Sequence, residues 1–265
     1  MQKKSQIKNK SPKTVKTVQR ADLLVYLSDL LQVAKVKDYC PNGLQVQGSA
    51  QIKKIVSGVT ASKALIEAAI DEKADTILVH HGWFWKNDDP VIVGQLHSRL
   101  KLLMDHNINL MAYHIPLDMH PKLGNNAQLA KLMGWVGKPD PVSGLIWQGQ
   151  AAKTQKTVAQ LARSLASRLG RDPLVLGDLN KPIRRIAWCT GAAQGYINEA
   201  ISMKVDAYIS GEVSEPTFHI AEEMGVVYIA AGHHATERYG VAALGEHLST
   251  KFGIQHDFID IPNPV

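Results

Sequence analysis

The chain has 265 residues, and its 30 Lys and Arg against 24 Asp and Glu give a formal net charge of +6. This length allows one large hydrophobic core or two modest ones. All apolar runs are far shorter than the roughly 20 residues of a bilayer-spanning helix, so no membrane span is predicted.

The excess of positive charge lies at the N-terminus. Residues 1–20 hold seven basic and no acidic side chains, and the rest of the chain is close to neutral. This segment is rich in Lys, Ser and Gln and has no apolar stretch like that of a secretory signal. We therefore expect a disordered basic tail on a cytoplasmic protein. An electrostatic arm for phosphate-rich partners such as nucleic acid is the alternative.

The cysteine and histidine content restricts the kind of metal site. Only Cys40 and Cys189 occur, and they form no CxxC spacing, which excludes a disulfide framework and a thiolate metal cluster. The chain has 11 histidines, so any transition-metal site must be built from imidazole and carboxylate ligands.

The first elements along the chain are a helix and a β-α-β unit. Leucines at helical spacing predict a helix over residues 20–34. A buried strand at 54–59, an amphipathic helix at 62–73 and a second buried strand at 76–79 follow.

This unit recurs 131 residues later in the chain. The segment "KIVSGVTASKALIEAAIDEKADTILVHHG" aligns without a gap with "RIAWCTGAAQGYINEAISMKVDAYISGEV", so that Ile55 meets Ile186 and Asp75 meets Asp206. Such a match is typical of a duplicated domain. The sequence therefore predicts an α/β fold of two similar domains, with helices packed on mixed, mostly parallel sheets.

The segment "KPDPVSGLIWQG", rich in Pro and Gly, separates the two copies and predicts a domain boundary near residues 135–141. Further helices are expected at 157–169 and 243–252, and a closing strand at 255–261.

Histidines stand where the predicted parallel strands end. Ligand sites of parallel sheets lie beyond the carboxyl ends of the strands, so these histidines are candidate metal ligands. They are His80 and His81 after the strand 76–79, His114 after the strand 110–113, and His233 and His234 after the strand 226–231.

Each candidate has an alternative interpretation. On a continuing strand His80 and His81 would point in opposite directions, so both reach neighbouring metals only if the chain turns at once, as Gly82 allows. A strand end without a ligand role is the alternative. Asp118 is a carboxylate that can bridge two cations, and Pro116 favours a loop there; a turn or N-cap role is the alternative.

The segment "AGHHATERYG" adds a carboxylate on a predicted helix. His233 and Glu237 are four residues apart, and His234 and Glu237 are three apart, so either pair shares a helix face. Spacing alone does not separate the two pairs.

Three histidines and two carboxylates are too many for one tetrahedral site and leave open positions on two cations. Two divalent cations about 3.5 to 4 Å apart lower the pKa of a bridging water, which is hydrolytic chemistry. Mixed imidazole and carboxylate ligation suits zinc, iron, manganese, cobalt or nickel.

The second copy carries Gly211 and Glu212 in place of the paired histidines of the first. We expect Glu212, His219 and His114 to act as catalytic acid–base groups or to support the ligands, and helix-capping or surface roles are the alternative.

The motifs "PNGLQVQG", "SGVTAS", "LVHHGWFW", "HIPLDMHPKLGNNAQLA", "SGEVSE" and "AGHHATERYG" closely resemble those of the Nif-three-like family, also called the dinuclear-metal-centre or GTP cyclohydrolase I type 2 homologue family. The resemblance is closest to the short bacterial branch and covers residues 22–265.

The resemblance implies a metal-binding α/β domain of residues 21–130 plus 233–265, with a second α/β domain of residues 131–232 inserted in it. It implies a toroidal homohexamer whose metal sites face the interior. It also implies a set of ligands in which His233 is favoured over His234: His80, His81, Asp118, His233 and Glu237.

Three functions follow from this reading. The first is a metal-dependent hydrolase of a small heterocyclic or nucleotide-like substrate, with GTP ring opening as the named candidate. The second is a two-metal phosphoesterase or nuclease, which should carry a basic track leading to the metals. The third is a metal-binding oligomeric scaffold or regulator without catalytic activity.

Overall fold

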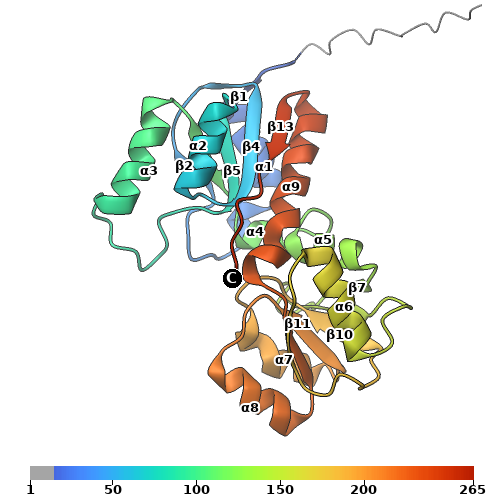
Figure 1. Cartoon of the computed structure of the whole chain (residues 1–265). Coiled ribbons are helices and arrows are strands. Elements are labelled where there is room, and N and C mark those ends of the chain that lie inside the picture. Colours follow the sequence, from blue (N-terminus) through green and yellow to red (C-terminus); the bar gives the residue numbers. More distant parts are fainter. Residues whose placement is uncertain (1–14) are drawn as a thin grey trace, which may run out of the picture.

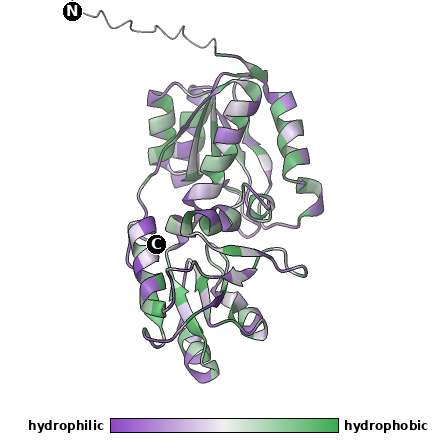
Figure 2. Ribbon diagram, turned by 90° about the vertical axis from the view of Figure 1, so that its right-hand side faces the viewer, coloured by the Kyte–Doolittle hydropathy of each residue, from purple (hydrophilic) through white to green (hydrophobic). Residues whose placement is uncertain are grey.

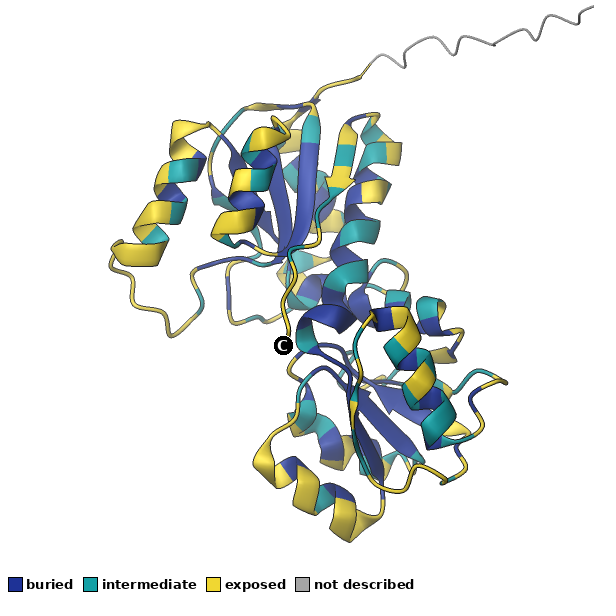
Figure 3. Cartoon of the chain, in the orientation of Figure 1, coloured by how far each residue is buried: buried dark blue, intermediate teal, exposed yellow. Residues whose placement is uncertain are grey.

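The computed structural model describes residues 15–265, and the predicted disorder of residues 1–14 lies outside the described residues. The described chain is built on two large β-sheets with helices packed on them, and it also has a two-stranded sheet (Figure 1). The central strands of both sheets are buried, whereas the edge strands and one side of the helices are exposed to solvent (Figure 3). The predicted α/β fold is confirmed.

The first sheet has five strands in the order β13-β4-β5-β6-β2. β13, β4, β5 and β6 run parallel, and β2 is an antiparallel edge strand. The bounds are Gly43–Val46 for β2, Lys54–Thr60 for β4, Thr76–His81 for β5, Asn109–Ala112 for β6 and Gln255–Phe258 for β13.

Helices cover both faces of the first sheet, because its central strands carry apolar side chains on both faces. Apolar residues of α1 (Arg20–Leu30) and α9 (His233–Phe252) pack in one core cluster with Ile55, Leu78 and Met111. Residues of α2 (Lys63–Asp71) and α3 (Gly94–Asp105) pack in another, against the opposite face. Hydrophobic and hydrophilic residues alternate along the helices accordingly (Figure 2).

The second sheet has six strands in the order β7-β8-β10-β11-β12-β9. β10, β11 and β12 run parallel, and the flanking strands pair antiparallel. The bounds are Val136–Pro139 for β7, Trp147–Gln150 for β8, Leu174–Leu176 for β9, Arg185–Trp188 for β10, Ala207–Ser210 for β11 and Val227–Ala230 for β12.

The helices of the second sheet are arranged in the same way. α5 (Asn125–Met133) and α6 (Val158–Leu169) contribute to the core cluster on one face. α7 (Ile197–Ser202) and α8 (Glu215–Met224) contribute to the cluster on the other face.

The repeat seen in the sequence has the same strand register in both copies. Ile55 of β4 pairs with Thr76 of β5, and Ile186 of β10 pairs with Ala207 of β11, which are the corresponding positions 131 residues on. The aspartates of the repeat also match. Asp75 Oδ2 accepts hydrogen bonds from the backbone N–H groups of residues 53 and 54, and Asp206 Oδ2 accepts them from those of residues 184 and 185.

The predicted tail of residues 1–20 extends too far. Val18–Gln19 form strand β1, which pairs with β3 (Gln51–Ile52), and α1 begins at Arg20. Arg20 Nη1 donates to the Gly48 carbonyl over 2.6 Å, which anchors the start of the helix. Arg20, a basic residue of the predicted tail, therefore belongs to the folded part of the chain.

One further expectation was wrong. Residues Ile115–Asp118 form a one-turn helix, α4, instead of a loop; Pro116 is tolerated because it lies in the first turn, where its missing N–H has no helical partner. The helix expected at 243–252 is confirmed; it is the second half of α9, which begins at His233 between the two sheets and runs along the first (Figure 1).

The predicted domain boundaries remain predictions. α5 crosses the predicted boundary at residue 130, its Leu129 and Met133 both pack in the core of the second sheet, and α5 also contacts α9. In the part of the chain that is described, no helix has the length and apolar character needed to cross a membrane.

Candidate metal centre

The candidate ligands come from three segments that meet beyond the end of β5. β5 ends at His80 and His81, α4 ends at Asp118, and α9 begins at His233. Glu237 follows His233 by one helical turn, so both side chains lie on the same face of α9.

The ligand atoms form two groups that share Glu237. One group contains His80, Asp118 and Glu237, and the other contains His81, His233 and Glu237; within each group the ligand atoms lie within 4.8 Å of one another. Glu237 Oε1 lies 3.6 Å from His80 Nε2. Glu237 Oε2 lies 3.1 Å from His81 Nε2 and 3.0 Å from His233 Nε2. Asp118 Oδ2 lies 3.5 Å from His80 Nε2.

Glu237 is therefore the carboxylate placed between the two groups. From the sequence, Asp118 was the carboxylate expected to bridge two cations. In the structure Asp118 belongs to one group only. Each oxygen of Glu237 faces a different group, which is the arrangement that a bridging carboxylate requires.

The histidine pKa values reflect this crowding of charge. Burial disfavours the charged form of His80, but Asp118 and Glu237 outweigh it and raise the pKa to about 9. Burial likewise opposes charge on His233, whose pKa Glu237 and Glu212 raise to about 9. Burial lowers the pKa of His81 to about 4, because Glu237 compensates only part of it.

The pKa values of Asp118 and Glu237 shift in opposite directions. Burial raises the pKa of Asp118. Burial also acts to raise the pKa of Glu237, but the imidazoles of His81 and His80 hold it well below its usual range. Glu237 is thus the ionised centre of the cluster.

The donor set fits divalent metal ions. Glu237 Oε2 is buried and has no hydrogen-bond partner of adequate geometry among residues 15–265, although two imidazole nitrogens lie near it. A buried carboxylate oxygen without a partner is costly, and a cation shared with those imidazoles would satisfy it. Imidazole and carboxylate ligands are those that divalent transition metals prefer.

The remaining nitrogen of each ligand histidine is held by a neighbour. His80 Nδ1 lies 3.0 Å from the Tyr113 carbonyl, and His233 Nδ1 lies 2.6 Å from Glu212 Oε1. These contacts fix the ring orientation and direct Nε2 of each ring into the cluster. Glu212, predicted as a catalytic or supporting group, thus contacts a candidate ligand, and it lies just beyond the end of β11 in the second sheet.

His114, also predicted as catalytic, lies at the edge of the cluster. Its ligand nitrogen falls within 4.8 Å of those of His80 and His81. His114 Nδ1 lies 2.8 Å from Asp38 Oδ1, and Asp38 Oδ2 accepts the backbone N–H of Ile115. Sequence reasoning missed Asp38, whose position 76 residues before His114 gave no spacing signal.

Cys40 lies beside this pair. Its thiol is grouped with Asp38 and His114. Burial and the Asp38 carboxylate raise the pKa of Cys40 to about 12, so the thiol is protonated near neutral pH.

Two candidate histidines are not brought to the cluster. His219 is exposed on α8, where Nε2 lies 3.1 Å from Glu215 Oε1. His234 Nε2 lies 2.7 Å from Asp260 Oδ1, in contact with the C-terminal segment. Of the two pairs that spacing left open, the structure brings His233 and Glu237 to the cluster.

The carboxyl edge of the second sheet closes the cluster from the other side. A Cβ atom at Gly191, which follows β10 with φ of 71°, would lie 2.1 Å from Glu237 Oε1. A Cβ atom at Gly211, the position equivalent to His80, would lie 2.7 Å from the His233 Cα. The start of α9 therefore leaves no room for a second pair of histidines in the second copy.

Comparison with known proteins places this arrangement in a family. Residues 18–264 match the family described as Duf34/NIF3 (NGG1p interacting factor 3), so the chain belongs to the Duf34/NIF3 family. This confirms the resemblance inferred from the sequence motifs.

Close relatives share the name GTP cyclohydrolase 1 type 2 homolog. The Pseudomonas aeruginosa relative is 54% identical over 238 residues, which are 88% of this chain and 94% of the relative. The Allochromatium vinosum relative is 51% identical over 245 residues, 92% of this chain and 96% of the relative. The solved structure of the protein ybgI, 45% identical, has a TM-score of 0.89 and covers 94% of this chain and 100% of its own.

Proposed function

We propose that this protein is a dinuclear-metal-dependent hydrolase of a small heterocyclic or nucleotide-like substrate. The observation that carries the proposal is the position of Glu237, whose two oxygens face two separate groups of ligands. When bound there, a pair of divalent cations supplies Lewis acidity that activates water and polarises the bond to be cleaved. Zinc, iron, manganese, cobalt and nickel all suit these ligands.

The protein's own residues have distinct parts in this proposal. His80, His81, Asp118, His233 and Glu237 hold the cations. Glu212 orients His233 through the 2.6 Å contact to its Nδ1. Asp38 orients His114, whose ring lies 5.0 Å from that of His80 and 5.7 Å from that of His81, and His114 can accept or donate a proton during the reaction.

GTP ring opening is the named candidate reaction, since the relatives carry the name GTP cyclohydrolase 1 type 2 homolog. The nuclease alternative gains no support from the cavity beside His81, whose wall contains Asp88 and Asp89 and a single arginine, Arg99, instead of a basic track.

Turnover by the purified, metal-loaded protein tests the proposal. GTP, other nucleotides and cyclic amides are incubated with wild type, Asp118→Ala and His219→Ala, and product formation is followed by mass spectrometry. We expect turnover that Asp118→Ala abolishes and His219→Ala preserves, with unchanged circular dichroism in both variants. No turnover across the panel would contradict the hydrolase and favour the scaffold.

The homohexamer expected from the family resemblance is part of this proposal. Light scattering of the purified protein measures its mass in solution. A monomer would contradict the hexamer without bearing on the metal centre.

A further inference from the structure

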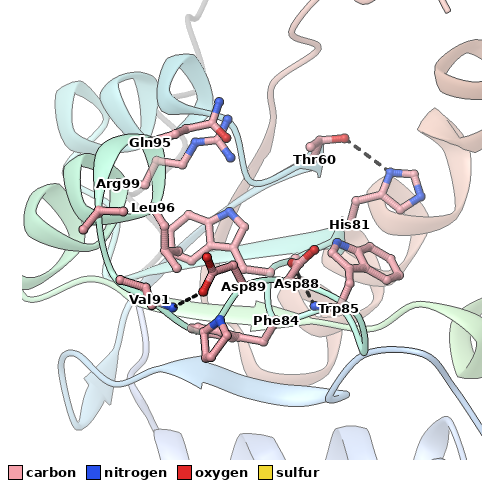
Figure 4. Close-up of a pocket in the computed structure, with 14 residues that line it drawn as sticks. Thr60, His81, Phe84, Trp85, Asp88, Asp89, Val91, Gln95, Leu96 and Arg99 are labelled. Carbon is pink, nitrogen blue, oxygen red and sulfur yellow. Dashed lines mark hydrogen bonds between the residues drawn. The ribbon is translucent and has the colours of Figure 1, made fainter.

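A cavity of about 660 Å³ lies beside the candidate metal centre (Figure 4). The loop that follows β5 and the first turns of α3 line it, and His81 forms part of its wall. A ligand in this cavity would therefore reach one of the two groups that share Glu237.

One wall of the cavity is aromatic. Trp83, Phe84 and Trp85 follow His81 almost directly and all line it. The Trp85 ring lies 6.1 Å from that of His81 and, edge to face, 5.0 Å from that of His114. Trp83 Nε1 donates to the Ala61 carbonyl over 3.0 Å, which fixes the indole. Rigid aromatic surfaces of this kind favour flat rings.

The backbone of the loop that carries Trp83, Phe84 and Trp85 is strained at Phe84. Phe84 has φ of 65°, in the left-handed region that residues other than glycine rarely adopt. Strain of this sort costs about 1 kcal/mol or more and persists where the surroundings impose it, often at binding sites.

Arg99 provides the cationic group of the cavity. It projects from α3 on the side opposite His81 and Trp85 (Figure 4). Its Nε atom is buried and has no hydrogen-bond partner among residues 15–265. A guanidinium with a buried, unused donor is suited to bind a carboxylate or phosphate with two parallel hydrogen bonds.

The two acidic residues of the cavity are occupied by the backbone of the same loop. Asp88 Oδ2 accepts the N–H of Trp85 over 3.1 Å, and Asp89 Oδ1 accepts the N–H of Val91 over 3.0 Å. These carboxylates shape the loop, and Arg99 remains available to a ligand.

We infer that this cavity binds the body of the substrate, a flat heteroaromatic ring bearing a carboxylate or phosphate, with the ring against Trp85 and the anionic group on Arg99. The inference rests on the proposed function, because it assigns the reacting end of the same substrate to the cluster at His81.

Calorimetric titration of the metal-loaded full chain tests this site with two matched pairs of probes. Pyridine-3-carboxylate is compared with pyridine-3-carboxamide, and guanosine monophosphate with guanosine, so that only the anionic group differs within a pair. The variants are Arg99→Gln and, as a matched control, Lys101→Gln, whose exposed side chain lies on the same helix and pairs with Asp105.

In wild type and Lys101→Gln we expect the anionic member of at least one pair to bind about tenfold more tightly than the neutral member. In Arg99→Gln this ratio should fall to near one. A preference in the first pair alone identifies a carboxylate site, and in the second alone a phosphate site. A ratio that survives in Arg99→Gln, or no binding of either anionic probe, would overturn the inference.

The outcome is separable from that of the proposed function. Arg99-dependent binding of a probe without turnover of any substrate would contradict the hydrolase and leave the site in place. Turnover with the same KM in wild type and Arg99→Gln would overturn the site and leave the hydrolase in place.

Discussion

Glu212 Oε1 lies 2.6 Å from His233 Nδ1, so a carboxylate at the edge of the second sheet holds an imidazole of the candidate metal centre. Glu212 stands at the repeat position of His81. One copy of the duplicated unit thus supplies ligands, and the other supports a ligand from α9. The centre therefore depends on both sheets.

Replacing Glu212 should weaken metal binding without removing a ligand. In Glu212→Ala we expect metal affinity to fall about 10- to 100-fold, since the His233 ring loses the partner that orients it. Competition with a chromophoric chelator measures the affinity. Glu215→Ala removes an exposed carboxylate of α8 as a control and should leave the affinity unchanged. Equal affinities for wild type and Glu212→Ala would show that His233 needs no such support.

Gly191 should tolerate no side chain. A Cβ atom there would lie 2.1 Å from Glu237 Oε1, and φ of 71° is unfavourable for alanine. We expect Gly191→Ala to lower metal content and to cost about 1 to 3 kcal/mol of stability. Metal analysis and denaturant unfolding check both. Gly195→Ala, where a Cβ meets no atom within 4 Å, is the matched control, and equal losses in the two variants would contradict the account.

Asp38 should make stability depend on pH. Burial opposes ionisation of Asp38, but hydrogen bonds from His114 and Asn42 lower its pKa to about 2. A pKa lower in the folded than in the unfolded state adds stability above the unfolded pKa, near 4, which is lost as pH falls towards 2. Solvent screening keeps the contribution below about 2 kcal/mol.

Denaturant unfolding of metal-free protein at pH 7 and pH 3 measures this contribution. Wild type should lose more stability between the two pH values than Asp38→Asn. Asp29→Asn, which alters an exposed aspartate of α1, should behave as wild type does. The same loss in Asp38→Asn and wild type would mean that the contact with His114 adds no stability.

The sequence predicted the repeat and its strands because buried β-α-β units have a strong local pattern. The gapless alignment paired Ile55 with Ile186, and these residues occupy equivalent positions in the two parallel ladders. The positions of the histidines at strand ends followed from the same pattern, since a strand's carboxyl end is a local feature.

What the sequence could not predict depends on contacts between distant segments. The pairing of Asp38 with His114 spans 76 residues, and that of Glu212 with His233 joins a strand end to a helix start. The place of Glu237 between two groups depends on how α9 approaches β5, which no spacing reveals. The prediction of a loop at Pro116 was wrong for a local reason, because proline blocks a helix interior but not its first turn.

The most direct test of the central claim is a count of bound metal ions per chain. Wild type, Asp118→Ala and Glu237→Ala are loaded with cobalt(II), freed of excess metal and analysed by mass spectrometry of the metal. If Glu237 links two groups, we expect about two ions in wild type, about one in Asp118→Ala and fewer than one in Glu237→Ala. If Glu237→Ala retains as much metal as Asp118→Ala does, the claim that Glu237 links the two groups is contradicted.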